Sequence, residues 1–166
     1  MSNYLQSIAL QENSSCVELY AYFGLAGNLE NPNEITSLLK IQPTWAFAKG
    51  QIIYSRGKPK GKRREGTWGF SSKNKLETTS MEKHLIFLLD KIEPFNSELI
   101  CLVNQLSLTV IFNCTWTFND TIGGPIITPE TLKKIANLGG YLSMATKSFR
   151  AFDDDDDDNE DDDNER

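Results

Sequence analysis

The chain has 166 residues, a length that fits one domain because roughly 100–150 residues already bury about two thirds of their unfolded surface. Residues 153–166 contain nine aspartates, two glutamates and one arginine, so this end carries a net charge of −10 and residues 1–152 carry +4. The sequence has neither an apolar run of about 20 residues nor a secretory signal, which argues against a membrane or secreted protein and predicts a cytoplasmic one.

The first part of the chain predicts an arm, a strand and a helix. Residues 1–15 are polar and patternless, which indicates a loosely held arm. The aromatic and branched residues of 16–25 favour a strand. Asn31 followed by Pro32 is typical of a helix start, with Asn31 as the N-cap, and apolar residues recur at helical spacing as far as Leu39.

The middle of the chain predicts a hairpin and two helices. Residues 45–55 and 67–72 are expected to pair as strands, joined by a loop with glycine and proline over residues 56–64. Apolar residues at helical spacing then predict one helix over residues 80–92 and another over residues 97–105.

The clearest pattern is an alternation of apolar and polar residues over 108–119, which predicts a strand with one buried face. A threonine cap before Pro129 begins a helix, and the glycines at 139–140 end it. Residues 141–149 predict the last strand. From Asp153 onward no apolar residue occurs, so we expect a disordered tail that cannot offset the entropy of ordering.

This order of elements predicts an α+β domain over residues 16–152, between the arm and the acidic tail of residues 153–166. The expected fold is a ferredoxin-like split βαβ sandwich with an additional C-terminal helix-strand unit. Helices would cover one face of a mixed, mainly antiparallel sheet.

Residues that carry chemistry are sparse. His84 is the only histidine and is predicted to be structural. Cys16, Cys101 and Cys114 lack the spacing of a zinc site and the even number of a disulfide framework, so we expect reduced thiols in or near the core. The sequence shows no phosphate-binding glycine loop and no paired carboxylate motif. We therefore expect no catalytic residue, no metal, no cofactor and no enzymatic activity.

Six cations lie within nine residues of the predicted loop, which Trp68 and Phe70 follow on the next strand. This composition suits contacts with phosphates and stacking on bases, but it also suits a solvated loop that keeps the protein soluble. The candidate contact residues for a partner or nucleic acid are Arg56, Lys58, Lys60, Lys62, Arg63 and Arg64.

The acidic tail leaves three interpretations open. It is a solvating appendage, it folds back to screen the cationic loop, or it imitates the charge of nucleic acid toward a basic partner. Its aspartates lack the glycine and the spaced ligands of a helix-loop-helix calcium site.

A pattern of small, apolar and aromatic positions runs through the chain, with its most distinctive part between Pro32 and Gly50. Its positions are Tyr22, Phe23, Gly27, Pro32, Glu34, Ile35, Thr36, Leu39, Ile41, Pro43, Thr44, Lys49, Gly50, Trp68 and Ser71. In this pattern the chain resembles the bacterial family called domain of unknown function 4279 over roughly residues 17–150. The resemblance implies a compact cytoplasmic α+β domain without an assigned activity.

Among these positions, a lysine beside a glycine in a predicted strand indicates the close approach of another backbone or of an anionic ligand. Structural roles remain the alternative. The candidate ligand or partner site comprises Thr44, Trp45, Lys49, Trp68 and Ser71.

We expect a non-enzymatic protein-interaction domain, for example an immunity-type protein that neutralises a toxin, and a monomer or homodimer that does not bind membranes. Two alternatives stay open. One is a nucleic-acid-binding module that uses the loop of residues 56–64, and the other is a binder of a small molecule or anion near Lys49.

Overall fold

A computed structural model describes residues 8–12, 16–119 and 124–148. The predicted tail of residues 153–166 and much of the predicted arm lie outside these residues. The elements, in chain order, are β1 (Cys16–Gly27), α2 (Asn33–Leu39), β2 (Trp45–Phe47), β3 (Ile52–Ser55), β4 (Lys58–Lys62), β5 (Gly66–Ser71), α3 (Met81–Ile92), the 3-10 turn η1 (Glu93–Phe95), α4 (Asn96–Gln105), β6 (Thr109–Phe118), α5 (Pro129–Asn137) and β7 (Tyr141–Ser148).

Five strands form one sheet in the order β2-β5-β1-β6-β7, and β3 pairs only with β4. All pairs in the main sheet are antiparallel except β6 with β7, which is parallel. The insertion of β5 between β1 and β2 is the split βαβ arrangement, and α5 with β7 adds the C-terminal helix-strand unit. The predicted fold class is confirmed.

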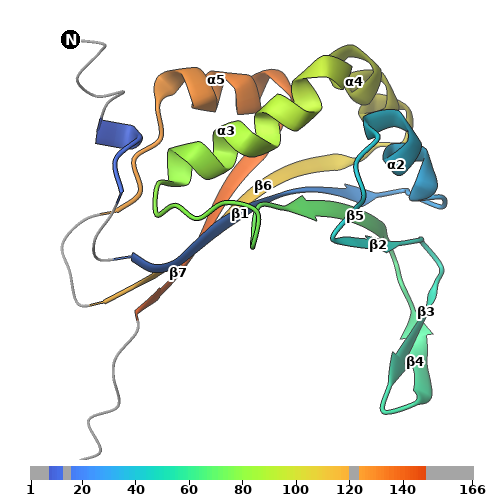
Figure 1. Ribbon diagram of the computed structural model, residues 1–166. Coiled ribbons are helices and arrows are strands. Elements are labelled where there is room, and N and C mark those ends of the chain that lie inside the picture. Colours follow the sequence, from blue (N-terminus) through green and yellow to red (C-terminus); the bar gives the residue numbers. More distant parts are fainter. Residues whose placement is uncertain (1–7, 13–15, 120–123, 149–166) are drawn as a thin grey trace, which may run out of the picture.

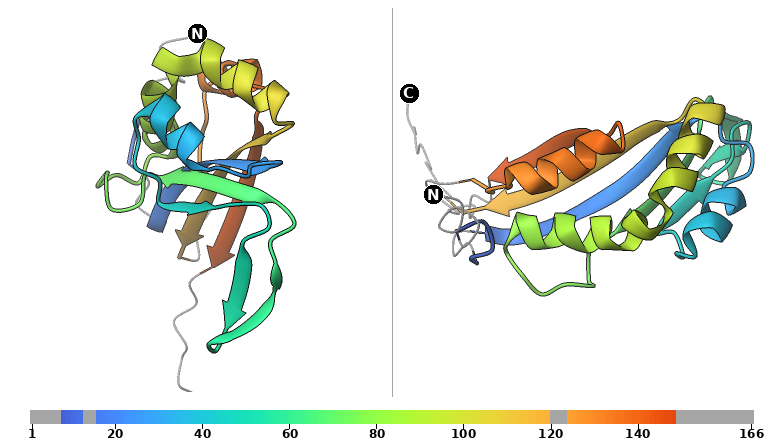
Figure 2. Two further views of the ribbon diagram at one scale, coloured as in Figure 1. Left: turned by 90° about the vertical axis from the view of Figure 1, so that its right-hand side faces the viewer. Right: turned by 90° about the horizontal axis from the view of Figure 1, so that it is seen from above.

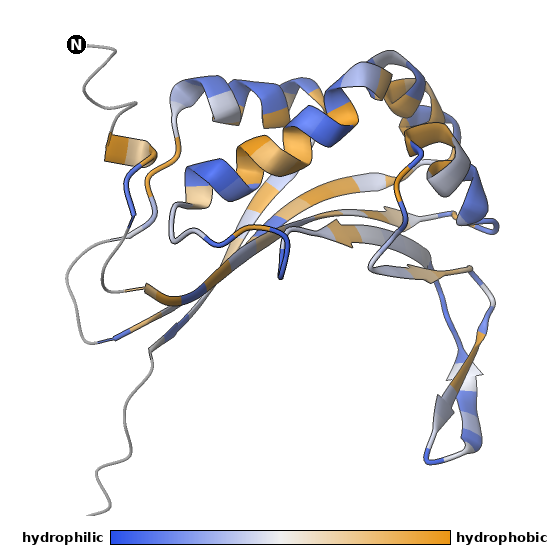
Figure 3. Cartoon of the chain, in the orientation of Figure 1, coloured by the Kyte–Doolittle hydropathy of each residue, from blue (hydrophilic) through white to orange (hydrophobic). Residues whose placement is uncertain are grey.

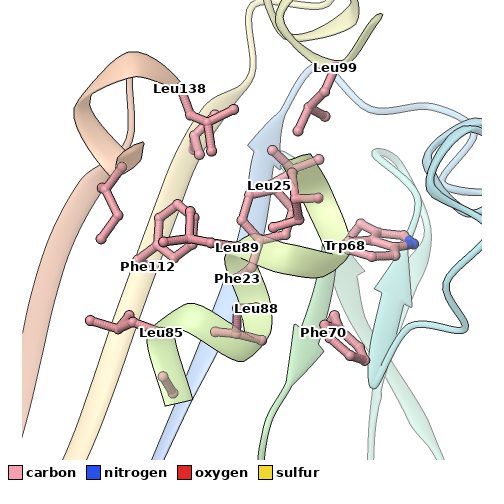
Figure 4. Packing of buried hydrophobic residues seen from close by; sticks show 14 of the residues in the cluster. Phe23, Leu25, Trp68, Phe70, Leu85, Leu88, Leu89, Leu99, Phe112 and Leu138 are labelled. Carbon is pink, nitrogen blue, oxygen red and sulfur yellow. The ribbon is translucent and has the colours of Figure 1, made fainter. Parts of the chain in front are cut away.

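The helices lie together on one side of the main sheet, while the β3–β4 hairpin extends from the other side (Figures 1 and 2). The buried hydrophobic residues of the helices and the sheet form one cluster, and Figure 3 colours hydrophobic segments in both layers. Leu85, Leu88 and Leu89 of α3 pack there against the aromatic side chains of Phe23 and Phe112 (Figure 4). This packing confines the core to one face of the sheet.

The predicted helices begin and end close to their observed bounds. Ser80 caps α3, because its side chain accepts a hydrogen bond from the backbone N–H of Lys83 at 3.4 Å. Thr128 caps α5 in the same way toward Thr131. The N-cap of α2 is Pro32 rather than Asn31, whose side chain instead accepts from the backbone N–H of Asn33 at 3.3 Å.

The prediction of one strand over residues 45–55 and a loop over residues 56–64 was wrong. The chain leaves the main sheet after Phe47, and β3 then pairs with β4, which consists of residues 58–62. β4 consists only of lysine, glycine and proline, so its sequence lacks the alternation of apolar and polar residues that predicts a strand. Most of the predicted basic loop is therefore one strand of a hairpin.

The described part of the arm, residues 8–12, is tied to the start of α3. Glu12 accepts hydrogen bonds from the Thr78 hydroxyl at 2.6 Å and the Lys83 ammonium at 2.8 Å, and also from the Thr79 backbone N–H. These contacts, led by the one with Lys83, lower the pKa of Glu12 to about 2. The carboxylate is thus charged at neutral pH and holds this segment in place.

Candidate functional site

The β3–β4 hairpin is exposed along its whole length. Arg56 (φ 49°) and Gly57 (φ 75°) form its turn with positive φ at both positions, the conformation typical of tight hairpins. The two strands pair Ser55 with Lys58 and Ile52 with Lys62, with a register shift between these pairs. Because Ile52 and Ser55 are three residues apart, their partners Lys58 and Lys62 lie on opposite faces of the ribbon.

Charge on this ribbon is therefore not confined to one side. Residues 52–64 contain six cations and no carboxylate. The same ribbon exposes apolar side chains of β3, where Tyr54 is 65% and Ile52 44% exposed. Figure 3 shows this combination of hydrophilic and hydrophobic segments.

The base of the hairpin is anchored to the main sheet. The backbone N–H of Gly50 donates to Arg63 O, and the N–H of Arg63 donates to Gln51 O, both at 2.9 Å. The guanidinium of Arg63 lies 3.6 Å from the centre of the Phe47 ring. A two-stranded ribbon is marginally stable alone, so these contacts orient it.

The face of the main sheet opposite the helices, called the open face below, begins at this anchor. Trp45 and Phe47 point to it, because Trp45 pairs with Gly69 while Trp68 and Phe70 face the core. A Cβ atom at Gly69 would lie 1.9 Å from Cζ2 of Trp45, so the indole rests directly on the strand.

Further aromatic rings of β1 continue along the open face. Tyr22 meets Trp45 edge to face with ring centres 5.0 Å apart. The ammonium of Lys73 lies 4.7 Å from the Tyr20 ring and 2.6 Å from the Glu18 carboxylate. The four rings of Phe47, Trp45, Tyr22 and Tyr20 are all half-buried.

The structure divides the predicted ligand or partner site between two faces of the sheet. Trp68 is fully buried on the core side, where its indole N–H donates to the Thr36 hydroxyl at 3.0 Å. Trp45 lies on the open face. The Thr44 hydroxyl accepts from the backbone N–H of Ser71 at 3.0 Å, and the Lys49 ammonium donates to the side chain of Asn28 at 2.7 Å. The polar side chains of Thr44 and Lys49 and the backbone of Ser71 thus make hydrogen bonds that join segments of the fold.

Sequence reasoning placed no serine near His84, but the structure does. Nδ1 of His84 lies 2.7 Å from the Ser72 hydroxyl, and Nε2 lies 3.0 Å from the carbonyl oxygen of Thr78. Because a carbonyl only accepts, Nε2 carries the proton and Nδ1 accepts from Ser72. Both side chains are 0% exposed, so this pair lies in the core and fixes α3 to the end of β5.

Because His84 is buried, its titration makes the stability of the protein depend on pH. Desolvation lowers the pKa of His84 from 6.5, against smaller opposing effects of Thr78 and Glu12. The unfolded chain therefore binds a proton more readily, and stability is lost as pH falls below about 6.5. Between pH 7 and about 5.5 we expect the free energy of unfolding to fall by up to about 1.4 kcal/mol per pH unit.

Urea unfolding at several pH values measures this slope. In His84→Gln, whose amide keeps a donor and an acceptor but does not titrate, the slope over the same range should largely disappear. Equal slopes in the two proteins would contradict the assignment. Since the chain has a single histidine, no other imidazole contributes.

A second buried polar cluster joins α3 to α5. Glu82 is 2% exposed, and its carboxylate accepts from the Thr128 hydroxyl at 2.6 Å, the Thr128 backbone N–H at 3.1 Å and the Thr131 hydroxyl at 2.6 Å. The acid thus satisfies polar groups at the first turn of α5, where negative charge is favourable. In the sequence, Glu82 lies on the same face of the predicted helix as Leu85 and Leu89. A glutamate on that apolar face was the sequence feature that indicated a buried polar contact.

The cysteines differ in their surroundings. Burial raises the pKa of Cys114 to about 12 and also raises that of the half-buried Cys16. Cys101 is exposed on α4, so it does not lie in the core as expected. Among the residues that the structure describes, no group of three His, Cys, Asp or Glu is placed to hold a metal ion, and no helix is long and apolar enough to cross a membrane.

Comparison with known proteins gives one result. The family model described as Domain of unknown function (DUF4279) matches residues 17–148, from the start of β1 to the end of β7. No curated protein and no solved structure matches the chain significantly. The match includes the β3–β4 hairpin and ends before the acidic tail.

Proposed function

The chain belongs to the family Domain of unknown function (DUF4279), whose description assigns no activity, and we propose from the hairpin that this member binds nucleic acid. The observation that carries the proposal is the exposed β3–β4 ribbon, with six cations and no carboxylate between residues 52 and 64. The exposed ribbon contributes little to the core, which leaves its side chains available for contact with another molecule.

Physical chemistry favours a polyanion as the ligand. Lys58 and Lys62 lie on opposite faces of the ribbon, so phosphates on either side meet a cation. A two-stranded ribbon is also narrow enough to enter the major groove of a duplex. Each phosphate that a cation neutralises releases counterions, which makes such binding strongly dependent on salt.

The test is oligonucleotide binding as a function of salt, measured with the full chain and with a chain that ends at Phe152. If all six cations contact phosphates, a plot of the logarithm of the association constant against the logarithm of the salt concentration should have a slope of about −4 for single strands. The slope should be steeper for duplexes. The shortened chain, which carries a net charge of +4, should bind more tightly than the full chain.

A matched pair of variants locates the binding site. Lys58→Glu, Lys60→Glu and Lys62→Glu together should weaken binding at least about 100-fold at low salt. The same reversal at three exposed lysines on the helix side, Lys75, Lys91 and Lys133, should change it less than about threefold. Absence of binding at low salt, or equal losses in both variants, would refute the proposal.

As a second candidate we propose a protein partner, as in an immunity-type protein that blocks a toxin. The observation that favours it is the apolar surface of β3, where Ile52, Ile53 and Tyr54 are all exposed. If a toxin is encoded beside this gene, Ile53→Asp with Tyr54→Asp should abolish binding of that toxin, while the affinity for oligonucleotides should be low in both the unaltered protein and this variant. Retained toxin binding in that variant would count against this candidate.

A further inference from the structure

The aromatic rings of the open face are partly accessible to solvent. Gly69 and Gly24 have no side chain, and the rings of Trp45 and Tyr22 occupy the space above them. The ring atoms of Tyr22 lie 3.6 and 3.7 Å from where a Cβ of Gly24 would be. Both rings therefore contact the backbone of the sheet, and half-burial of both side chains leaves part of each ring accessible to solvent.

The elements of the described chain that pack on the sheet lie on its other side, as Figures 1 and 2 show. The row of rings also has a cation at each end. Arg63 stacks on Phe47 where the hairpin begins, and Lys73 lies over Tyr20 at the far end. Polar groups border the row on β6 and β7, where the Asn113 amide donates to the Ser143 hydroxyl at 3.2 Å.

We propose that the open face binds single-stranded nucleic acid, with bases stacked on Phe47, Trp45 and Tyr22 and the phosphate backbone led toward Arg63 and the hairpin. The inference rests on the proposed function and adds the class of nucleic acid. Bases in a duplex are stacked on one another and offer only their edges, whereas an unpaired base can place its flat side on a ring. A sheet face with aromatic rings and flanking cations suits the unpaired form.

Tryptophan fluorescence provides a direct readout with the full chain. Of the three tryptophans, Trp68 (0% exposed) and Trp116 (6%) face the core, so Trp45 is the one that a base can reach. A short oligothymidylate should quench the fluorescence on binding. In Trp45→Phe, which keeps an aromatic ring, the quenching should disappear while affinity changes less than about fivefold.

Affinity measurements with a matched control complete the test. Phe47→Leu and Tyr22→Leu should each weaken binding of oligothymidylate about 5- to 100-fold. Tyr22→Leu leaves the contact of Arg63 with Phe47 at the base of the hairpin intact, so it should leave binding of a duplex of equal length unchanged. Phe87→Leu is the control, because Phe87 is a half-buried phenylalanine with a lysine nearby, but on the helix side. It should change neither affinity. Urea unfolding verifies that each variant is folded.

The outcomes separate the two proposals. Preference for single strands, with quenching at Trp45 and selective loss in Tyr22→Leu, supports the inference. Equal affinity for single strands and duplexes, no quenching and no effect of the ring variants would overturn it, while sensitivity to the hairpin charge reversal would leave the proposed function intact. Binding of neither oligonucleotide at low salt would overturn both, and a protein that occupies the rings would then replace nucleic acid as the ligand.

Discussion

Gly66→Ala should destabilise the protein by about 3 kcal/mol or more. Gly66 begins β5 opposite Gly27, and an added Cβ would lie 1.9 Å from the carbonyl oxygen of Leu29. Since that oxygen belongs to the backbone, it cannot rotate away as a side chain would, and the loop after β1 must move. The midpoint of urea unfolding measures the loss.

Gly24→Ala is the matched control for this change. Gly24 is also buried in the main sheet, but its added Cβ would have its nearest neighbour at 3.6 Å, an ordinary contact distance. We expect its free energy of unfolding to change by less than about 1 kcal/mol. Similar losses of stability in the two variants would show that the close approach of Leu29 is not what destabilises Gly66→Ala.

Glu82→Ala is expected to cost about 3–4 kcal/mol, because it leaves three buried donors of Thr128 and Thr131 without their acceptor. The loss of stability in Glu82→Ala should be largest where α5 meets α3. Hydrogen exchange of the α5 backbone amides should therefore accelerate more in this variant than that of the β1 amides. Hydrogen exchange and urea unfolding measure the two effects.

Two comparisons separate charge from packing. Glu82→Gln keeps the shape and one acceptor oxygen and should lose less than Glu82→Ala. Glu130→Ala removes an exposed acid from the first turn of the same helix and should cost no more than about 1 kcal/mol. If Glu82→Ala were as mild as Glu130→Ala, the buried cluster would contribute no net stability.

Much of the fold could be predicted because its signals are local. The alternation over residues 108–119 marks β6, and the threonine before Pro129 marks the start of α5, since side-chain period and capping act within a few residues. The resemblance to the family, based on spaced small and aromatic positions, is confirmed by the match over residues 17–148. The split βαβ arrangement follows from the order of elements.

The candidate site was predictable only in part, because it depends on pairings between distant segments. The six cations were evident, but β4 was not, since pairing with β3 forms a strand that has little strand propensity of its own. The position of Trp45 over Gly69 depends on the register of β2 with β5, as does the separation of Trp45 from Trp68. The contact of Ser72 with His84 likewise requires the folded chain.

The hairpin also bears on how this protein can diversify. Its nine strand residues are all exposed, so replacing most of them removes no core contact and leaves the scaffold as stable as before. If the hairpin binds phosphates as proposed, the cations of β4 that would contact them are separate from the residues that form the core, with Arg63 and Phe47 at the boundary. A ribbon of different charge can therefore be carried by the same sheet and helices without loss of core packing.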